Sequence, residues 1–162
     1  MQAPALDRPS QPGPLSLYVH VPFCSQICPF CPYNKIRAHA GLARRYFTAL
    51  DAEMAWYADA LAGAGFVAFT SLYIGGGTPT LYPAGLARIV AALPVTRERA
   101  VEVLPTHATP TGLERLREAG ITAVSIGAQS FHDEVLRRLQ RPHTAAHSLE
   151  AVEAAVGRFA CV

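Results

Sequence analysis

The sequence predicts an α/β fold whose strands form one parallel sheet. Short apolar runs alternate with longer amphipathic segments along the 162 residues, and strands that alternate with helices in this way form parallel sheets. Hydrophobic residues make up 51% of the chain and charged residues 16%, so a chain of this length can bury one sizeable core. We therefore expect a single α/β domain over residues 17–162.

Four strand-and-helix units are expected in order along the chain. The strands are residues 16–21, 70–75, 100–104 and 122–128. The helices are residues 42–61, 83–92, 111–119, 133–139 and 145–156. Gly63 and Gly65 follow the first helix, and Pro94 and Gly120 follow the second and third, as residues that terminate helices. Residues 158–162 have the apolar character of a fifth strand that is just beginning.

The N-terminal segment differs in composition from the rest. Residues 1–16 hold four prolines and no apolar stretch, which predicts a flexible tail and not a signal peptide. The formal net charge is only +2, and no basic block is interleaved with aromatic residues, so nothing indicates nucleic-acid binding. No apolar run approaches the ~20 residues of a membrane helix. We expect a cytoplasmic protein without a membrane span.

Three of the four cysteines lie close together, directly after the first expected strand. Cys24, Cys28 and Cys31 form a C-x3-C-x2-C cluster. Thiolates at this spacing can hold three irons of a cubane iron–sulfur cluster and leave the fourth iron free to bind a small molecule. The spacing therefore predicts a 4Fe-4S centre that takes part in chemistry.

Two other uses of the cysteines fit the sequence less well. A structural zinc site needs four ligands, and His20 and His39 lack the spacing to complete one. A disulfide framework would leave an odd thiol among the clustered cysteines. The fourth cysteine, Cys161, lies in an apolar run and is expected to be an ordinary core thiol.

A run of three glycines, Gly75 to Gly77, follows the second expected strand. Without Cβ atoms, this backbone can approach a ligand closely and adopt positive φ. The run matches neither a phosphate loop nor a dinucleotide fingerprint, because no Gly-Lys-Ser/Thr and no third spaced glycine follow. From the glycine run alone, a tight turn that binds no ligand is an equally good interpretation. Ligands of parallel sheets lie at the carboxyl ends of the strands, where the glycines, the cysteine loop and Gln129 all fall.

Together these motifs resemble the radical S-adenosylmethionine (SAM) superfamily. Tyr-Val-His-Val-Pro-Phe precedes the cysteines, Gly-Gly-Gly-Thr-Pro-Thr follows the second strand, and residues 125–131 read Ser-Ile-Gly-Ala-Gln-Ser-Phe. Within the superfamily, the chain is similar to the branch of oxygen-independent coproporphyrinogen III oxidase, the related haem chaperone and methyltransferases. The resemblance runs from Leu17 to the C-terminus and implies a partial (β/α) barrel of the radical SAM type.

The resemblance also implies roles for individual residues. It assigns the iron–sulfur cluster to Cys24, Cys28 and Cys31, and it places SAM on the iron that they leave open. Contacts with SAM are implied for Tyr18, Phe30, Gly76, Gly77, Thr78, Glu102, Gln129 and Arg141. The chemistry is consistent, because Glu102 suits the ammonium group of SAM and Arg141 suits its carboxylate.

Several of these residues also have a purely structural interpretation. Glu102 is compatible with a solvated charge at a strand end, and Tyr18 with a place in the core. Arg141 follows Arg137 and Arg138 and is compatible with an exposed helix face. The histidines His107, His143 and His147 share no ligand spacing, so they are expected at the surface or in packing.

The implied activity is the reductive cleavage of SAM to methionine and a 5′-deoxyadenosyl radical, which abstracts hydrogen from an organic substrate. Oxidative decarboxylation of a porphyrinogen in haem metabolism is the leading specific reaction. Methyl transfer and haem binding by a chaperone without oxidase activity are the alternatives. The implied partners are a tetrapyrrole or other small-molecule substrate and a reductant protein such as flavodoxin or ferredoxin.

The chain departs from the coproporphyrinogen oxidase pattern in several ways, one of which is that only 23 residues precede Cys24. Tyr33 stands where a further cysteine usually follows the cluster, and residues 102–105 read Glu-Val-Leu-Pro instead of Glu-Ala-Asn-Pro. About four of six expected units are present, so residues 17–162 are expected to form the N-terminal part of a radical SAM core, truncated before its fifth strand is complete. We expect little activity from such a chain alone, because an open site admits water.

Overall fold

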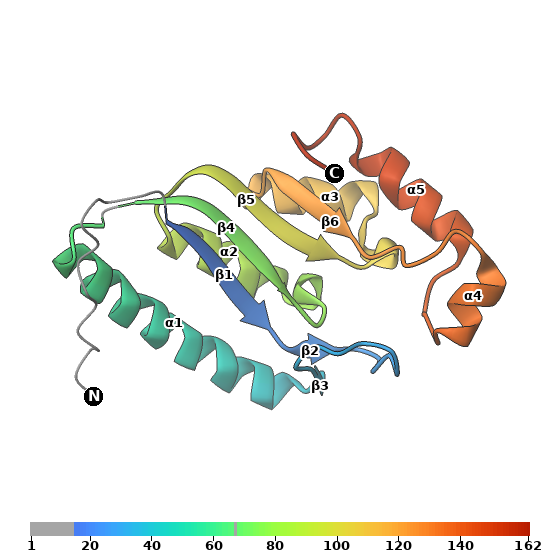
Figure 1. The fold of residues 1–162 in the computed structure, drawn as a ribbon, viewed down its shortest axis with the longest axis horizontal. Coiled ribbons are helices and arrows are strands. Elements are labelled where there is room, and N and C mark those ends of the chain that lie inside the picture. Colours follow the sequence, from blue (N-terminus) through green and yellow to red (C-terminus); the bar gives the residue numbers. More distant parts are fainter. Residues whose placement is uncertain (1–14, 67) are drawn as a thin grey trace.

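The computed structural model describes residues 15–66 and 68–162, and at its centre is a four-stranded parallel sheet (Figure 1). The strands are β1 (Ser16–Val21), β4 (Phe69–Gly76), β5 (Val95–Val103) and β6 (Ala123–Ile126), in the spatial order β1-β4-β5-β6. The four strands therefore lie side by side in the same order as they occur along the chain. The expected α/β class with a parallel sheet is confirmed.

Five α-helices of the described residues connect and follow these strands. They are α1 (Ala40–Gly63), α2 (Pro83–Ala92), α3 (Pro110–Glu118), α4 (Asp133–Arg138) and α5 (Ala145–Ala155). Gly65 after α1 and Gly120 after α3 terminate these helices as expected, with φ of 94° and 91°, whereas Gly63 is the last residue of α1 and does not follow it. Of the helices in the described part of the chain, none is both long and apolar enough to cross a membrane.

Shorter elements lie around the carboxyl ends of the strands. The 3-10 turns η1 (Pro79–Leu81) and η2 (Pro105–His107) follow β4 and β5. A two-residue parallel pair joins β2 (Phe23–Cys24) to β3 (Ile36–Arg37), and it was not expected from the sequence. This pair closes the base of the loop that holds the clustered cysteines.

The hydrophobic core lies between one face of the sheet and the helices packed on it. Val19, Ile74 and Val101 point to this face, and each is at most 7% exposed. They belong to one buried cluster with helix residues such as Phe47 of α1 and Leu86 of α2. Because side chains of a strand alternate between the two faces, every second strand residue contributes to this core.

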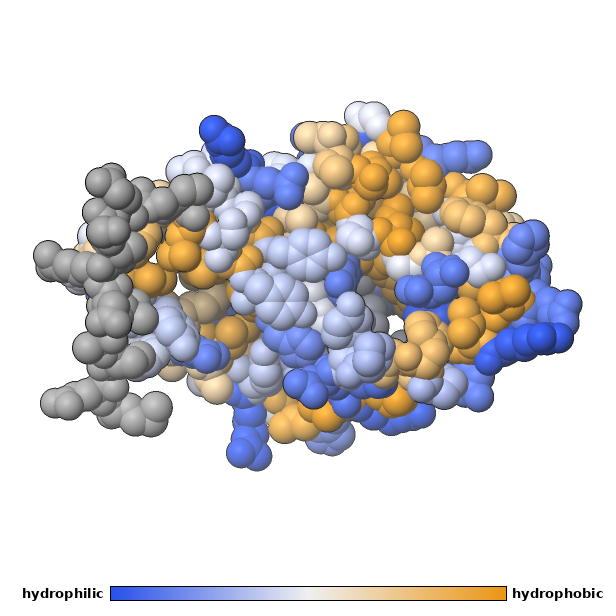
Figure 2. All heavy atoms as spheres, in the orientation of Figure 1, coloured by the Kyte–Doolittle hydropathy of each residue, from blue (hydrophilic) through white to orange (hydrophobic). Residues whose placement is uncertain are grey.

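The opposite face of the sheet is polar and has no layer of helices over it (Figure 1). Tyr18, Tyr73, Glu102 and Ser125 project from it, one from each strand. Tyr18 is paired in register with Tyr73, and Glu102 with Ser125. Figure 2 shows weakly hydrophilic side chains across the middle of this open face. The sheet thus has one face for packing and one that is available to ligands.

Two strand boundaries differ from the expected ones by more than one residue. β5 begins at Val95 rather than at residue 100, because the polar residues 96–99 are part of the strand although they interrupt its apolar pattern. β6 ends at Ile126 rather than at residue 128. The predicted tail, residues 1–16, lies outside the described residues except for Leu15 and Ser16. Leu15 accepts a hydrogen bond from the Thr70 amide (2.8 Å), and Ser16 begins β1.

The C-terminal residues pair with the edge of β6. Ala123 and Cys161 form a parallel bridge, in which the Val124 amide donates to the Cys161 carbonyl (3.1 Å). Where a fifth strand was expected to begin, the described residues thus form one isolated bridge and no strand. Phe159 is buried beneath this segment, but Cys161 is exposed. The expectation of a core thiol at Cys161 was wrong, because only Phe159 of this apolar run enters the core, while Ala160, Cys161 and Val162 are exposed at the sheet edge.

Candidate functional site

A cavity of about 420 Å³ lies at the carboxyl ends of the four main strands. Its walls come from the cysteine loop, the glycine turn after β4, the end of β5 and the segment after β6. They include Cys24, Cys28, Phe30, Cys31, Tyr33, Lys35, Gly76, Gly77, Thr78, Glu102, Ser125, Gly127, Gln129 and Arg141. Every predicted site residue except Tyr18 lines this cavity.

The cysteine loop holds its thiols toward the protein rather than toward solvent. Cys24 and Cys28 are buried and Cys31 is half-buried. The loop is closed at its base, where the Ile36 amide donates to the Pro22 carbonyl (2.8 Å) and the Ala38 amide to the Cys24 carbonyl (2.8 Å). The three thiols are therefore presented from one short loop with fixed ends.

The donor set fits a cubane cluster better than a single ion. Among the described residues, no three His, Cys, Asp or Glu side chains converge as ligands of one metal ion. In a cubane, by contrast, each thiolate binds a different iron, so the thiols need only surround the cluster. Burial raises the pKa of the Cys24 thiol, and the Thr78 hydroxyl and the Lys35 ammonium group oppose that shift. These two groups favour the thiolate that an iron would bind.

The glycine turn packs directly against the cysteine loop. The Gly77 amide donates to the Val21 carbonyl (2.8 Å), and the Thr78 amide donates to the Phe23 carbonyl (2.7 Å). A Cβ at Gly77 would lie 2.6 Å from the Phe23 oxygen and 2.8 Å from Cys24 Sγ. Gly76 has a φ of 116°, which favours glycine. The run is thus a tight turn, and the turn itself forms part of the cavity wall.

Glu102 is a hydrogen-bonded group and not a solvated charge at a strand end. Its carboxylate accepts from the Gly76 amide (2.9 Å) and from the Tyr73 hydroxyl (3.1 Å). Burial, together with the charge of Glu102, raises the pKa of Tyr73, so this phenol stays protonated and donates to the carboxylate. The arrangement fixes a negative charge at the floor of the cavity.

Tyr18 lies outside the cavity, on the open face of the sheet. It is 56% exposed, so its interpretation as a core residue was wrong. Its ring stacks on Tyr73 at 6.1 Å, and its hydroxyl bonds to His20 Nδ1 (2.8 Å). His20 Nε2 lies 2.8 Å from the Asn34 carbonyl, which can only accept, so Nε2 carries the proton and Nδ1 accepts from Tyr18. Tyr18 therefore reaches the cysteine loop through His20.

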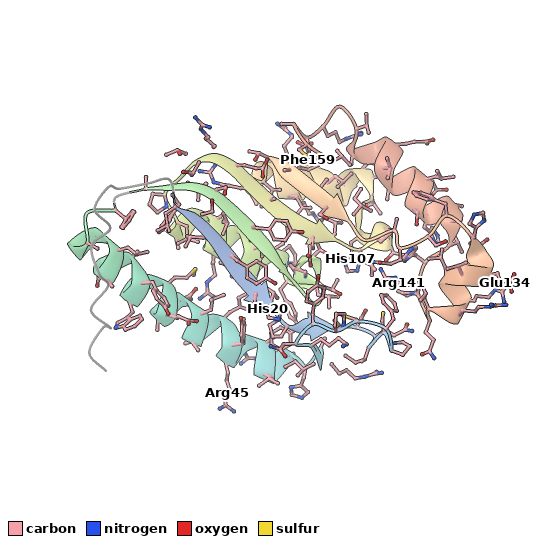
Figure 3. All side chains as sticks on the ribbon, viewed as in Figure 1. His20, Arg45, His107, Glu134, Arg141 and Phe159 are labelled. Atoms are coloured by element: carbon pink, nitrogen blue, oxygen red, sulfur yellow. The ribbon has the colours of Figure 1, made fainter. Side chains whose placement is uncertain are left out.

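Arg141 points inward from the turn that follows α4. Its Nη2 donates to the Gly127 carbonyl (2.9 Å), and its Nη1 lies 3.5 Å from Cys28 Sγ. Its Nε is buried and has no hydrogen-bond partner among the described residues. Figure 3 shows Arg141 between the end of β6 and the cysteine loop. The interpretation as an exposed helix face fits Arg138, which pairs with Glu134 (2.6 Å), but not Arg141.

The segment between β6 and α4 is held in an unusual backbone conformation. Gln129 has a φ of 63°, which is uncommon for a residue with a side chain. Behind it, the buried His143 donates from Nε2 to the Ala128 carbonyl (2.9 Å), and burial lowers the pKa of His143. His143 is thus a packing residue, as expected, and His147 caps the start of α5. This support presents Gln129 to the cavity.

Several residues of the cavity wall were not predicted as site residues, among them Lys35, Tyr33 and Ser125. Lys35 donates to the Cys31 carbonyl and to the Tyr33 carbonyl (3.4 Å), which steadies the end of the cysteine loop. Tyr33 is 61% exposed at the cavity mouth. Ser125 lies beside Glu102 in the sheet. For Lys35, the available signal was an isolated cation four residues after a cluster cysteine.

Comparison with known proteins identifies the family of the chain. Residues 18–161 match the sequence model of the family described as the Radical SAM superfamily. The chain is 36% identical over 147 residues to the oxygen-independent coproporphyrinogen III oxidase of Paracoccus denitrificans. The matched region covers 86% of this chain and 32% of that protein. It is 32% identical over 136 residues to the heme chaperone HemW of Bacillus subtilis. The matched region covers 79% of this chain and 35% of that protein.

Solved structures give the same grouping. The coproporphyrinogen III oxidase HemN of Escherichia coli, described as a radical SAM enzyme, superposes with a TM-score of 0.77 at 32% identity, over 91% of this chain and 36% of that one. Methylornithine synthase superposes with a TM-score of 0.56 at 14% identity, over 92% of this chain and 43% of that one, which shows a shared fold only. The chain spans about a third of the length of the curated relatives described above.

Proposed function

We propose that this chain, which belongs to the radical SAM superfamily, binds a 4Fe-4S cluster through Cys24, Cys28 and Cys31 and binds SAM in the adjoining cavity. The observation that carries the proposal is the meeting of three thiols, a glycine turn and two opposite charges around one cavity. When bound, the cluster supplies an electron that cleaves SAM to methionine and a 5′-deoxyadenosyl radical, which takes a hydrogen atom from the substrate.

The charged residues of the cavity suit the methionine end of SAM. Glu102 offers a carboxylate to the ammonium group, and it is held in place by Gly76 and Tyr73. Arg141 offers a guanidinium group to the carboxylate, and its unpartnered buried Nε is a donor that such a ligand could satisfy. Gly76 and Gly77 let the backbone come close to the ligand, while Phe30 and Gln129 are available to the adenosine part.

A coproporphyrinogen oxidase-like reaction is the specific activity that we propose first. Relatives that bear this name match the chain at 35–38% identity, and HemN of Escherichia coli shares the fold over most of the chain. The open face of the sheet supports a planar substrate, because Tyr18 and Tyr73 offer exposed aromatic rings there. A tetrapyrrole is the substrate class, and a reductant protein such as flavodoxin or ferredoxin would supply the electron.

Haem binding is the second candidate, because a relative at 32% identity is named as a heme chaperone. Tyr33 stands where the oxidases usually carry a further cysteine, which weakens the oxidase assignment and leaves methyl transfer as a third activity. The relatives named as oxidase and chaperone are longer proteins, of which this chain covers 32% and 35%.

The deciding experiment is made on one anaerobically reconstituted sample of the chain. We expect about four irons and four sulfides per chain, and formation of 5′-deoxyadenosine when dithionite and SAM are added. Haem titration of the same sample separates the chaperone from the oxidase. Stoichiometric zinc without sulfide would refute the proposal, and tight haem binding without SAM cleavage would favour the chaperone.

A further inference from the structure

The turn that links α4 to α5 contacts the cysteine loop at two places. Gln26 Nε2 donates to the Gln140 carbonyl (2.7 Å), and Arg141 Nη1 lies against Cys28 Sγ (3.5 Å). Gln140 and Arg141 are adjacent in the turn, and Gln26 lies two residues before Cys28 in the cysteine loop. Two adjacent contacts of this kind fix the cysteine loop against the turn more firmly than either would alone.

The backbone of this turn is itself held in place. Gln140 has a φ of 53°, in the left-handed region that non-glycine residues rarely adopt. Its amide donates to the Arg137 carbonyl (3.0 Å), and the Arg141 amide donates to the Leu136 carbonyl (2.9 Å). These bonds fasten the turn to the end of α4, so the Arg141 side chain starts from a fixed position.

The guanidinium group of Arg141 connects three segments. One nitrogen reaches the Cys28 thiol of the cysteine loop and another donates to the Gly127 carbonyl after β6, while the backbone belongs to the turn after α4. The Gly127 carbonyl oxygen carries a partial negative charge, and Cys28 carries a full negative charge when it is a thiolate. A contact with SAM alone would not require the group to touch the cysteine.

We infer that Arg141 is a positioning residue for the Cys28 ligand and sets the reduction potential of the cluster, in addition to any contact with SAM. The inference rests on the proposed function, since it assumes that Cys28 binds iron. Hydrogen bonds and positive charge near a cluster thiolate stabilise the reduced form, which carries one more negative charge. Removal of the guanidinium group should therefore make the potential more negative.

The test is an EPR-monitored redox titration of the reconstituted full chain. SAM is left out, so that loss of a contact between Arg141 and SAM cannot change the measured potential. We expect the midpoint potential of Arg141→Gln to be more negative than that of the wild type at equal iron content. Arg141→Lys keeps a charge but cannot bridge Cys28 and Gly127, and it should fall between them. Arg138→Gln, on the exposed side of α4, is the matched control and should leave the potential unchanged.

A second measurement covers the case in which Arg141→Gln fails to fold. Gln26→Ala removes the other contact with the turn, so amide hydrogen exchange in residues 25–31 should be faster in this variant, even without the cluster. Wild-type exchange in Gln26→Ala, or a wild-type potential in Arg141→Gln or Arg141→Lys with full iron, would overturn the inference. Failure of the wild-type chain to assemble any cluster would instead refute the proposed function, and the inference with it.

Discussion

Ile74 and Tyr73 are neighbours in β4, yet Ile74 is completely buried under the helices while Tyr73 is 36% exposed on the open face. The same contrast separates Val101 from Glu102 in β5. Alternation along a strand thus directs one set of side chains into the core and leaves the other set accessible to a ligand. The two faces should therefore respond differently to substitution, and the cavity lies where the open face ends.

The largest expected effect is confined to the cavity. Cys24→Ala should abolish the iron–sulfur absorption of the reconstituted protein, because a cubane held by three thiolates loses one of its protein ligands. Iron and sulfide analysis measures the loss, with Cys161→Ala as the control that keeps the cluster. Full iron in Cys24→Ala would place the metal elsewhere.

The covered face should dominate stability. Ile74→Ala creates a cavity under α1 and α2 and should lower the free energy of unfolding by about 2–5 kcal/mol. This is a large share of the about 5–15 kcal/mol that holds a typical domain together. Urea unfolding of the apo-protein measures the change, and a loss below 1 kcal/mol would show that this face is poorly packed.

Substitution of Gly77 should disturb the cluster as well as SAM binding. A Cβ there would meet the Phe23 carbonyl oxygen at 2.6 Å, so the cysteine loop must move. We expect Gly77→Ala to lower both iron content and SAM affinity. At Gly63 an added Cβ meets nothing within 4 Å, so Gly63→Ala is the control. Normal iron with weakened SAM binding in Gly77→Ala would mean that the turn serves only the cofactor.

Glu102 tests the charged floor of the cavity. Glu102→Gln removes the negative charge but keeps an acceptor for the Gly76 amide. A charge-assisted hydrogen bond is worth about 1.5–3 kcal/mol, so SAM should bind about 10- to 150-fold more weakly. Equilibrium binding at constant iron content measures this change. Wild-type affinity would move the ammonium group of SAM away from Glu102.

The smallest effect is expected at Tyr73. Tyr73→Phe keeps the ring stacked on Tyr18 and removes one partly exposed hydrogen bond to Glu102, so stability should fall by about 0.5–1.5 kcal/mol. The same urea experiment applies. A loss as large as that of Ile74→Ala would erase the distinction between the two faces.

The sequence predicts the main strands and helices of this fold because most of them are marked locally. Apolar runs locate the strands, and Gly65, Pro94 and Gly120 lie where helices have ended. The polar residues 96–99 hide the first half of β5, since that half is held by pairing with β4 rather than by its own apolar pattern. The burial of Cys161 was mispredicted for a related reason. An apolar run does not reveal whether its residues pack inside the core or lie exposed at the edge of the sheet.

The candidate site is predictable where its residues are close in sequence. Cys24, Cys28 and Cys31 lie in one loop, and the glycines in one turn. The contact between Arg141 and Cys28 depends instead on how β6 and α4 are placed, and no local pattern encodes that placement. Likewise, the link from Tyr18 to the loop passes through His20 and the Asn34 carbonyl, and this link depends on the folded structure.

The contact between Gln26 and Gln140 also has a consequence for the order of events in folding. It spans 114 residues, and the neighbouring contact of Arg141 with Cys28 spans 113. Contacts between such distant parts of a chain form late, because the intervening segments must first be in place. During synthesis the three cysteines leave the ribosome long before Arg141 exists. The thiols therefore pass through a period in which they are already made but not yet enclosed, and iron delivered in that period meets an unfinished site.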